Sequence, residues 1–149
     1  MAKILRSIVG RTLGLGPALN LISNQVDITQ PCVDATVTVG DEATNVRAIT
    51  IQLKDARGRD IDYAEVVEVL LFADAAKAAF ASSSPSTGLA AGTDGDLEVI
   101  TANRSYYAVS ETDGDIDLTW TDTGTAAAFI GVRLPSGRIV MGDQALTNT

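Results

Sequence analysis

Apolar and polar residues alternate along most of the chain. Residues 33–39 alternate without a break, and residues 46–55 repeat the pattern. A period of two residues is typical of a β-strand that buries one face. Residues 66–72 are the most hydrophobic run in the sequence, and they predict a central, buried strand.

Turn residues separate these segments and predict where each strand ends. Gly40-Asp41 ends the first strand, Gly58 is free to take the positive φ of a tight turn, and Asp113-Gly114 is a hairpin signal. A four-residue turn is predicted at residues 135–138. Shorter strands are predicted between the later turns, over residues 97–100, 105–111, 116–121, 127–134 and 139–141.

Residues 74–92 break the alternation. Alanine dominates residues 74–81, and its high helix propensity predicts a short helix there. Residues 82–92 are small, polar and glycine-bearing, which predicts a long loop. About seven or eight short strands, spaced roughly ten residues apart, indicate an antiparallel β-sandwich and not alternating strands and helices.

The alternation also predicts the core. Inward positions are Ile49, Ile51, Leu53, Phe72, Ile116, Leu118, Trp120 and, according to register, Phe129 or Ile130. Tyr106 and Tyr107 are adjacent on a strand, so one is expected in the core and the other is available for an interface. Cys32 is predicted to be a small buried residue and not a nucleophile.

Composition excludes several classes of function. The chain has 149 residues, no histidine and one cysteine. A Ser-His-Asp triad, a Cys-His dyad, a His-ligated zinc site and an intrachain disulfide are therefore impossible within one chain. Aromatic residues are 5% of the sequence, too few for a sugar-binding cleft, so a carbohydrate-active hydrolase using paired aspartates ranks last. We expect a protein that is not an enzyme.

Alternating carboxylates are the candidate metal ligands. They form two runs: Asp113, Asp115 and Asp117, and Asp94, Asp96 and Glu98. Alternate residues of a strand share a face, so three carboxylates could converge on a cation. The first run begins like an EF-hand loop, but Leu118 stands where that loop needs glycine and Gly124 where it needs glutamate. A solvated strand face is the favoured interpretation over a calcium site, and we expect no bound metal.

Charge is distributed unevenly along the chain. The net charge is −8, yet residues 1–25 contain Lys3, Arg6 and Arg11 and no acid, which gives them +3. The remainder holds 8 bases and 19 acids, and such an acidic body repels nucleic-acid phosphates. No apolar stretch has the length of a signal-sequence core or a membrane span. We therefore expect neither nucleic-acid nor membrane binding.

Residues 1–30 are predicted to be an extended N-terminal arm ahead of a sandwich domain over residues 31–149. Glycines at residues 10–16 interrupt a helix. This stretch also lacks the third glycine of a dinucleotide fingerprint and the Gly-Lys-Ser/Thr of a phosphate loop, so no cofactor is expected.

The arm is the best candidate for partner binding, because it is too apolar for a free tail and carries positive charge. The predicted partner-binding residues are Lys3, Ile4, Leu5, Arg6, Ile8, Val9, Arg11, Leu13 and Leu15. The basic residues could face an acidic neighbour or the acidic body of a sister subunit. The alternative is that the arm supplies an edge strand to its own sandwich.

Residues 46–142 resemble an immunoglobulin-like domain that is common in structural proteins of tailed bacteriophages. The resemblance lies in residues 49–58, 66–74, 88–95, 110–118 and 132–138. Residues 4–15 are similar to the lead-in of phage proteins of this size. The resemblance implies an all-β, immunoglobulin-like antiparallel β-sandwich with an extended N-terminal arm.

The resemblance further implies a virion component, a capsid decoration (cement) protein on the outer surface of an HK97-like phage head that bridges neighbouring capsid subunits. The implied partners are the major capsid protein and further copies of this chain, as a dimer or trimer at a local symmetry axis. The alternative is a phage tail or fibre-attachment module whose loops, residues 74–95 and 110–115, contact the host surface or another tail protein.

Overall fold

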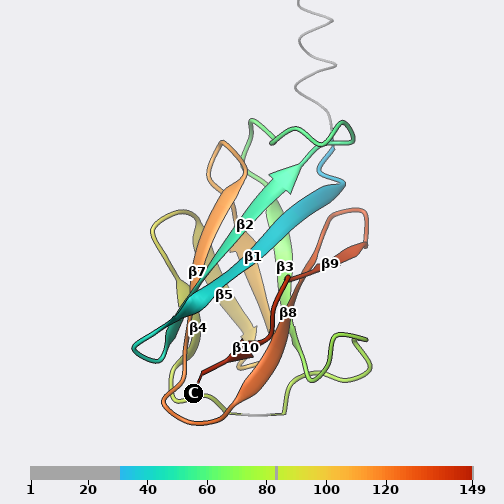
Figure 1. Ribbon diagram of the computed structural model, residues 1–149. Helices are drawn as coiled ribbons and strands as arrows, with labels where there is room; N and C mark the ends of the chain where they lie inside the picture. Colours follow the sequence, from blue (N-terminus) through green and yellow to red (C-terminus); the bar gives the residue numbers. More distant parts are fainter. Residues whose placement is uncertain (1–30, 83, 149) are drawn as a thin grey trace, which may run out of the picture. The chain divides into compact units, whose positions relative to one another are not determined.

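The computed structural model describes residues 31–82 and 84–148, and the predicted arm lies outside them. The described residues form ten β-strands and no helix, and the strands pair antiparallel in two facing sheets (Figure 1). This confirms the predicted antiparallel β-sandwich of immunoglobulin-like character. Nowhere in the described part of the chain is there a helix that is long and apolar enough to cross a membrane.

The first sheet has the strand order β1-β2-β7-β4. Its strands are β1 (Asp34–Ala43), β2 (Val46–Lys54), β7 (Asp115–Thr121) and β4 (Gly88–Ala91). The predicted alternation is confirmed on its two central strands. Their buried positions are Ile49, Ile51 and Leu53 on β2 and Ile116, Leu118 and Trp120 on β7.

The second sheet has the order β10-β8-β3-β6-β5, with β9 also paired to β8. Its strands are β3 (Val66–Phe72), β5 (Asp96–Thr101), β6 (Ser105–Val109), β8 (Ala127–Arg133), β9 (Ile139–Met141) and β10 (Leu146–Thr147). The hydrophobic run predicted to be central is β3, which lies between β8 and β6. On β8 the register buries Ile130 in the core, which settles the choice between Ile130 and Phe129.

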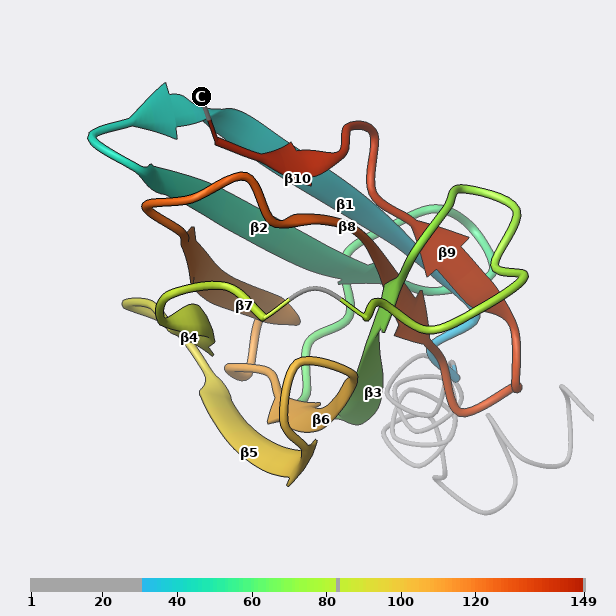
Figure 2. The same ribbon diagram turned by 90° about the horizontal axis from the view of Figure 1, so that it is seen from below.

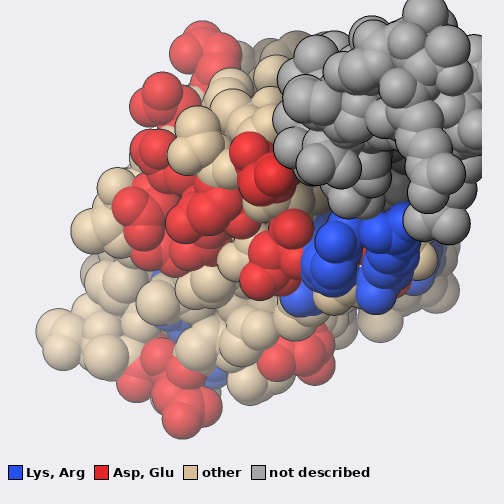
Figure 3. Space-filling view, turned by 90° about the horizontal axis from the view of Figure 1, so that it is seen from above, with Lys and Arg blue, Asp and Glu red and all other residues tan. Residues whose placement is uncertain are grey.

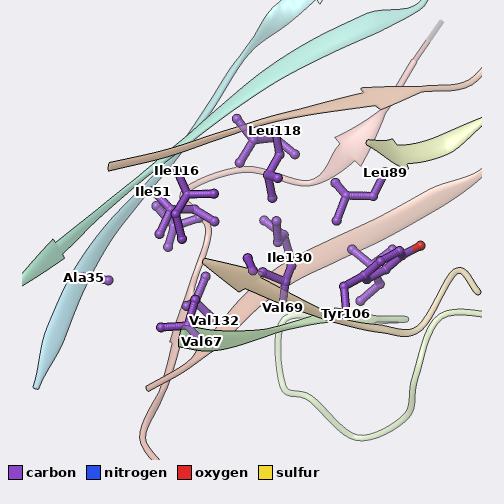
Figure 4. Close-up of a cluster of buried hydrophobic side chains, with 14 of the residues drawn as sticks. Ala35, Ile51, Val67, Val69, Leu89, Tyr106, Ile116, Leu118, Ile130 and Val132 are labelled. Carbon is purple, nitrogen blue, oxygen red and sulfur yellow. The ribbon is translucent and has the colours of Figure 1, made fainter. Parts of the chain in front are cut away.

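Side chains from the two sheets meet in one hydrophobic core. Leu118 of β7 and Leu89 of β4 lie across from Val69 of β3 and Ile130 of β8 (Figure 4). Burying an aliphatic side chain of this size stabilises the fold by about 1.5–3 kcal/mol. This core holds the two sheets together and so fixes the faces that point outward.

The adjacent tyrosines point to opposite faces, as predicted. Tyr106 is 3% exposed, and its hydroxyl accepts a hydrogen bond from the N–H of Asn103 (3.0 Å), whereas Tyr107 is 52% exposed. Cys32 is buried, also as predicted. Burial raises the pKa of the Cys32 thiol, which disfavours the reactive thiolate.

The helix predicted for residues 74–81 is wrong, because these residues form a turn that returns to β3. The N–H of Ala81 donates to the carbonyl of Leu71 (2.9 Å). The ring of Phe80 stacks on the ring of Phe72 with centroids 5.6 Å apart. A helix this short gains few internal hydrogen bonds against the cost of nucleation, so these contacts with β3 determine the path.

Three further expectations are corrected by the strand pairing. β1 does not end at Gly40-Asp41 but continues through a register shift after Val39. β4 lies within the predicted loop of residues 82–92. Asp113-Gly114 is a turn with Gly114 at φ 81°, but it connects β6 in one sheet to β7 in the other and is therefore not a hairpin.

Residues 139–147 close one side of the sandwich. β9 and β10 pair along one edge of β8, and the segment between them reaches β1 (Figure 2). There the carboxylate of Asp143 accepts from the N–H of Val39 (2.8 Å), and the N–H of Asp143 donates to the carbonyl of Val37 (3.2 Å). The side-chain amide of Gln144 donates to the carbonyl of Val39 (2.8 Å). These bonds occupy the free edge of β1 and block the addition of another strand.

Candidate functional site

The residues predicted to bind a partner all precede Pro31, where the described part of the chain begins. They are Lys3, Ile4, Leu5, Arg6, Ile8, Val9, Arg11, Leu13 and Leu15. Their role stays a prediction. The described domain offers two surfaces of its own, a carboxylate cluster and an outward-facing apolar surface.

The carboxylate cluster consists of Asp94, Asp113, Asp115 and Asp117, at the place where the β4–β5 connection runs beside β7. The N–H of Gly92 donates to the carbonyl of Asp117 (2.7 Å), and the N–H of Asp117 donates to the carbonyl of Asp94 (2.8 Å). Figure 3 looks down on the upper end of the domain in Figure 1 and shows acidic side chains gathered there, beside a patch of Lys and Arg. This end of the domain is therefore strongly acidic on one side.

Asp117 acts as a structural link within this cluster. Its Oδ1 accepts a hydrogen bond from the hydroxyl of Thr50 (3.1 Å), and its Oδ2 accepts one from the hydroxyl of Thr93 (2.6 Å). The carboxylate thereby ties the β4–β5 connection to β2 across β7. Both oxygens are already engaged within the fold.

Asp115 is the carboxylate of this cluster whose charged form is least favoured by its surroundings. Burial raises the pKa of its carboxyl, and the negative charge of Asp117 raises it further. Its Oδ1 is buried and accepts no hydrogen bond from a described residue. Within residues 31–82 and 84–148, no group of three or more His, Cys, Asp or Glu side chains is placed to hold a metal ion. The arrangement therefore concentrates like charge around Asp115.

The two acidic runs of the sequence do not converge on one site. Asp94 lies near Asp115. Asp96 and Glu98 instead lie on β5 in the second sheet, whereas Asp115 and Asp117 lie on β7 in the first. The alternation in the sequence could not reveal this separation, because it depends on which sheet each strand joins.

Replacing Asp115 by asparagine is expected to raise the free energy of unfolding by about 1 kcal/mol at pH 7. Asparagine keeps the shape of the side chain and removes the buried charge. Because the pKa of Asp115 is raised above the ordinary value of 3.8, the folded state binds this proton more tightly than the unfolded state. The contribution of Asp115 to the stability of the wild-type chain is therefore lost as pH rises above the ordinary pKa of the group.

Urea unfolding of both chains at pH 7 and near pH 3 measures this effect. The gain in the free energy of unfolding from Asp115→Asn should disappear near pH 3, where Asp115 is protonated in both the folded and the unfolded state. Asp96→Asn on the exposed β5 is the matched control and should change stability less. A gain of equal size at both pH values would contradict the electrostatic explanation.

Asp122 is a buried carboxylate that the sequence analysis did not single out. It accepts hydrogen bonds from the N–H groups of Ser86 (2.9 Å) and Ala126 (2.8 Å). The N–H of Ser86 lowers the pKa of Asp122 against the effect of burial, and the N–H groups of Ala126 and Gly124 lower it further. Asp122 thus holds the segment that precedes β4 against the β7–β8 turn. An aspartate followed by Thr-Gly is a typical turn signal, which could have identified it.

Exposed apolar side chains gather on three neighbouring strands of the second sheet. Five of the six exposed large hydrophobic residues in the described part lie there: Val66 on β3, Tyr107 and Val109 on β6, and Val99 and Ile100 on β5. Val66, Tyr107 and Val109 share the outward face, whereas Val99 is paired with the buried Tyr106, so it points to the inner face and is exposed at the free edge of β5. We call the outward surface of these strands, with the free edge of β5, the β3–β6–β5 face. Scattered exposed apolar residues are normal, but a contiguous group is typical of an interaction surface.

Strand register places carboxylates beside these apolar side chains. Tyr107 is paired with Glu68 on one side and Glu98 on the other, and Val109 is paired with Asp96. Directly paired residues of antiparallel strands share a face. The Glu68 carboxylate forms an ion pair with Arg133 (2.8 Å), whereas Asp96 and Glu98 have no ion pair with a described residue. The β3–β6–β5 face is therefore both apolar and acidic.

The class that this fold defines is an antiparallel β-sandwich of immunoglobulin-like character. Comparison with protein-family models, with curated proteins and with solved structures finds no significant match to this chain. The function is therefore argued from the surfaces of the domain and from the sequence.

Proposed function

We propose that this protein is a structural virion component, a capsid decoration (cement) protein that binds the outer surface of an HK97-like phage head and bridges neighbouring capsid subunits. The single observation that carries the proposal is the chemical contrast between an acidic β-sandwich and the apolar, basic residues 3–15. The resemblance of residues 46–142 to immunoglobulin-like phage domains supports the same conclusion. The chain's lack of histidine agrees with a binding role more than a catalytic one.

The energetics of such a segment favour attachment at several points. Residues 3–15 contain six large aliphatic side chains, and full burial of six such side chains is worth about 9–18 kcal/mol. Association costs about 4–15 kcal/mol in lost freedom and desolvation. One attached segment is therefore only marginally stable. A second contact, made through an edge of the sandwich, becomes effectively intramolecular and strengthens binding many-fold. If the second contact lies on a neighbouring subunit, the protein bridges the two subunits.

The acidic body fits an outward position on such a shell. The chain beyond residue 25 carries 19 acids and 8 bases, and such a charge keeps a protein surface solvated and discourages random association. Added contact area between capsid subunits raises the free energy needed to separate them. The shell thereby gains resistance to the outward pressure of packaged DNA.

Deletion of residues 1–15 tests this role. We expect the shortened chain to lose most of its retention on purified capsids, because the apolar side chains that dock are gone. A variant with Lys3, Arg6 and Arg11 all changed to glutamine is the matched control: it keeps the apolar residues and should bind more weakly, with less dependence on salt. Circular dichroism checks that both variants keep the β-sandwich. Unchanged retention of the deletion variant would contradict the proposal.

Copy number separates the head from the tail. Quantitative mass spectrometry of virions should find hundreds of copies per particle for a decoration protein, and a handful for the alternative tail or fibre-attachment module. The two predicted contact loops, residues 74–95 and 110–115, meet only in part. Residues 73–87 follow β3 and residues 110–115 follow β6, and these antiparallel neighbours send the two segments to opposite ends of the sandwich (Figure 1). Residues 92–94 instead lie beside β7, close to Asp113 and Asp115.

A further inference from the structure

The β3–β6–β5 face ends at an open sheet edge. β5 is the last strand in its sheet, and no hydrogen bond from a described residue outside the β5–β6 hairpin reaches it. Val99 and Ile100 on this strand are 54% and 45% exposed. The edge of β1, by contrast, is closed by Asp143 and Gln144. An open edge strand with exposed apolar side chains is a template for an added strand.

The same face of a second copy is a poor occupant of this surface. Two β3–β6–β5 faces in contact would bring Asp96 and Glu98 of one copy against the same carboxylates of the other. Like charges across an interface oppose binding. Arg133 offsets Glu68 only, so both β5 carboxylates remain unneutralised. The surface therefore favours an apolar partner that carries positive charge.

The chain contains a segment with this chemistry. Residues 3–15 hold six large aliphatic side chains and three basic ones, with no acid. The chain from residue 15 to Pro31 can extend over about 50 Å. A domain of this size is about 35 Å across. The segment is therefore long enough to reach the β5 edge of an adjacent molecule.

We propose that residues 3–15 of one copy bind the β3–β6–β5 face of a neighbouring copy, as a strand added to the edge of β5 with its basic side chains close to Asp96 and Glu98. A contact between a segment and a different surface of the next copy is heterologous, so it forms a closed ring where the rotation permits. The inference goes beyond the proposed function, because it names the surface that joins one copy to the next and needs no shell. A copy whose residues 3–15 are seated on a neighbour does not dock the same residues on the capsid, so the two contacts compete for this segment.

Disulfide trapping in the free, full-length protein tests whether the contact forms and whether the segment comes from a neighbouring copy or from the same chain. One chain carries Ser7→Cys and a second, tagged chain carries Val99→Cys. Cys32 is buried and does not compete. After mild oxidation of the mixture, we expect a mixed dimer well above the level of either homodimer. Thr36→Cys, at an exposed position of β1, replaces Val99→Cys in the matched control and should give no mixed dimer.

Two results of this experiment would overturn the inference. A third chain carries both Ser7→Cys and Val99→Cys. One contradicting result is a cross-link that forms only within this chain, which then migrates as a monomer, because the segment would bind its own domain. The other is the absence of a cross-link in both arrangements. Neither result bears on capsid retention, so failure of this contact and failure of the proposed function are distinguishable.

A charge exchange gives a second, independent test. Glu98→Lys should weaken self-association of the full-length chain by about tenfold in low salt, measured by sedimentation. Mixing this variant with a chain carrying Lys3→Glu, Arg6→Glu and Arg11→Glu should restore association between the two. Glu98 is exposed, so the substitution leaves the core intact. Equal association of the wild-type and Glu98→Lys chains would contradict the proposed contact.

Discussion

Replacing Trp120 by alanine is expected to lower the free energy of unfolding by about 3–5 kcal/mol. Trp120 is 1% exposed and is the largest of the fully buried side chains. Its strand, β7, lies between β2 and β4, where Trp120 is paired with Arg47 and Leu89. Ladders on both sides hold β7 in place, so the core cannot collapse into the space that the indole leaves.

Phenylalanine at position 120 is expected to cost much less than alanine. The indole Nε1 is buried and donates to no described residue, and such an unmade hydrogen bond costs about 1–3 kcal/mol. Phenylalanine removes this donor and fills most of the space. Urea unfolding should be followed by far-UV circular dichroism, because Trp120 is the only tryptophan and its fluorescence is lost in both variants. Equal losses for the two substitutions would contradict the cavity argument.

The strands with alternating residues could be predicted because burial on one face of a sheet has a period of two. Ile49 and Ile51 on β2, and Ile116 and Leu118 on β7, are buried as predicted. β4 has no such signal in its sequence, Gly-Leu-Ala-Ala. It becomes a strand because Leu89 pairs with Trp120 on β7, a contact between residues distant in the sequence. Local pattern cannot reveal a strand that depends on its partner.

The helix expected at residues 74–81 fails for a related reason. Alanine propensity favours a helix by only a few tenths of a kcal/mol per residue. The stacking of Phe80 on Phe72 and the hydrogen bond from Ala81 to Leu71 outweigh this preference. Both contacts require β3 to be in place, so the sequence of the segment alone could not predict them.

The candidate interaction surface could likewise be predicted only in part from the sequence. The sequence predicted that one of the two tyrosines would face an interface, because neighbours on a strand point in opposite directions. It could not predict that Glu68 and Glu98 flank Tyr107, since that depends on the register of β6 against β3 and β5. The combination of apolar and acidic character that defines the β3–β6–β5 face therefore belongs to the fold.

Gly95→Ala is expected to lower the free energy of unfolding by about 3 kcal/mol, against about 1 kcal/mol for Gly137→Ala. Both glycines have a positive φ, 80° and 84°, so both substitutions bear the cost of a left-handed alanine. A Cβ at Gly95 would lie 2.6 Å from the carbonyl oxygen of Val109, whereas a Cβ at Gly137 has nothing within 4 Å. The difference between their losses in the free energy of unfolding therefore measures the steric cost of the Cβ at position 95.

The backbone of Val109 cannot move to relieve this collision, because Val109 is paired with Val66 on one side and Asp96 on the other. Gly95 directly precedes β5, so the strain must displace the start of that strand. Gly95→Ala should therefore also reduce the mixed-dimer cross-link at Val99, while Gly137→Ala leaves it unchanged. Urea unfolding and cross-linking yield measure the two effects in the same pair of variants. Equal losses of stability in the two variants would show that the fold tolerates a shift of β5 at its first residue.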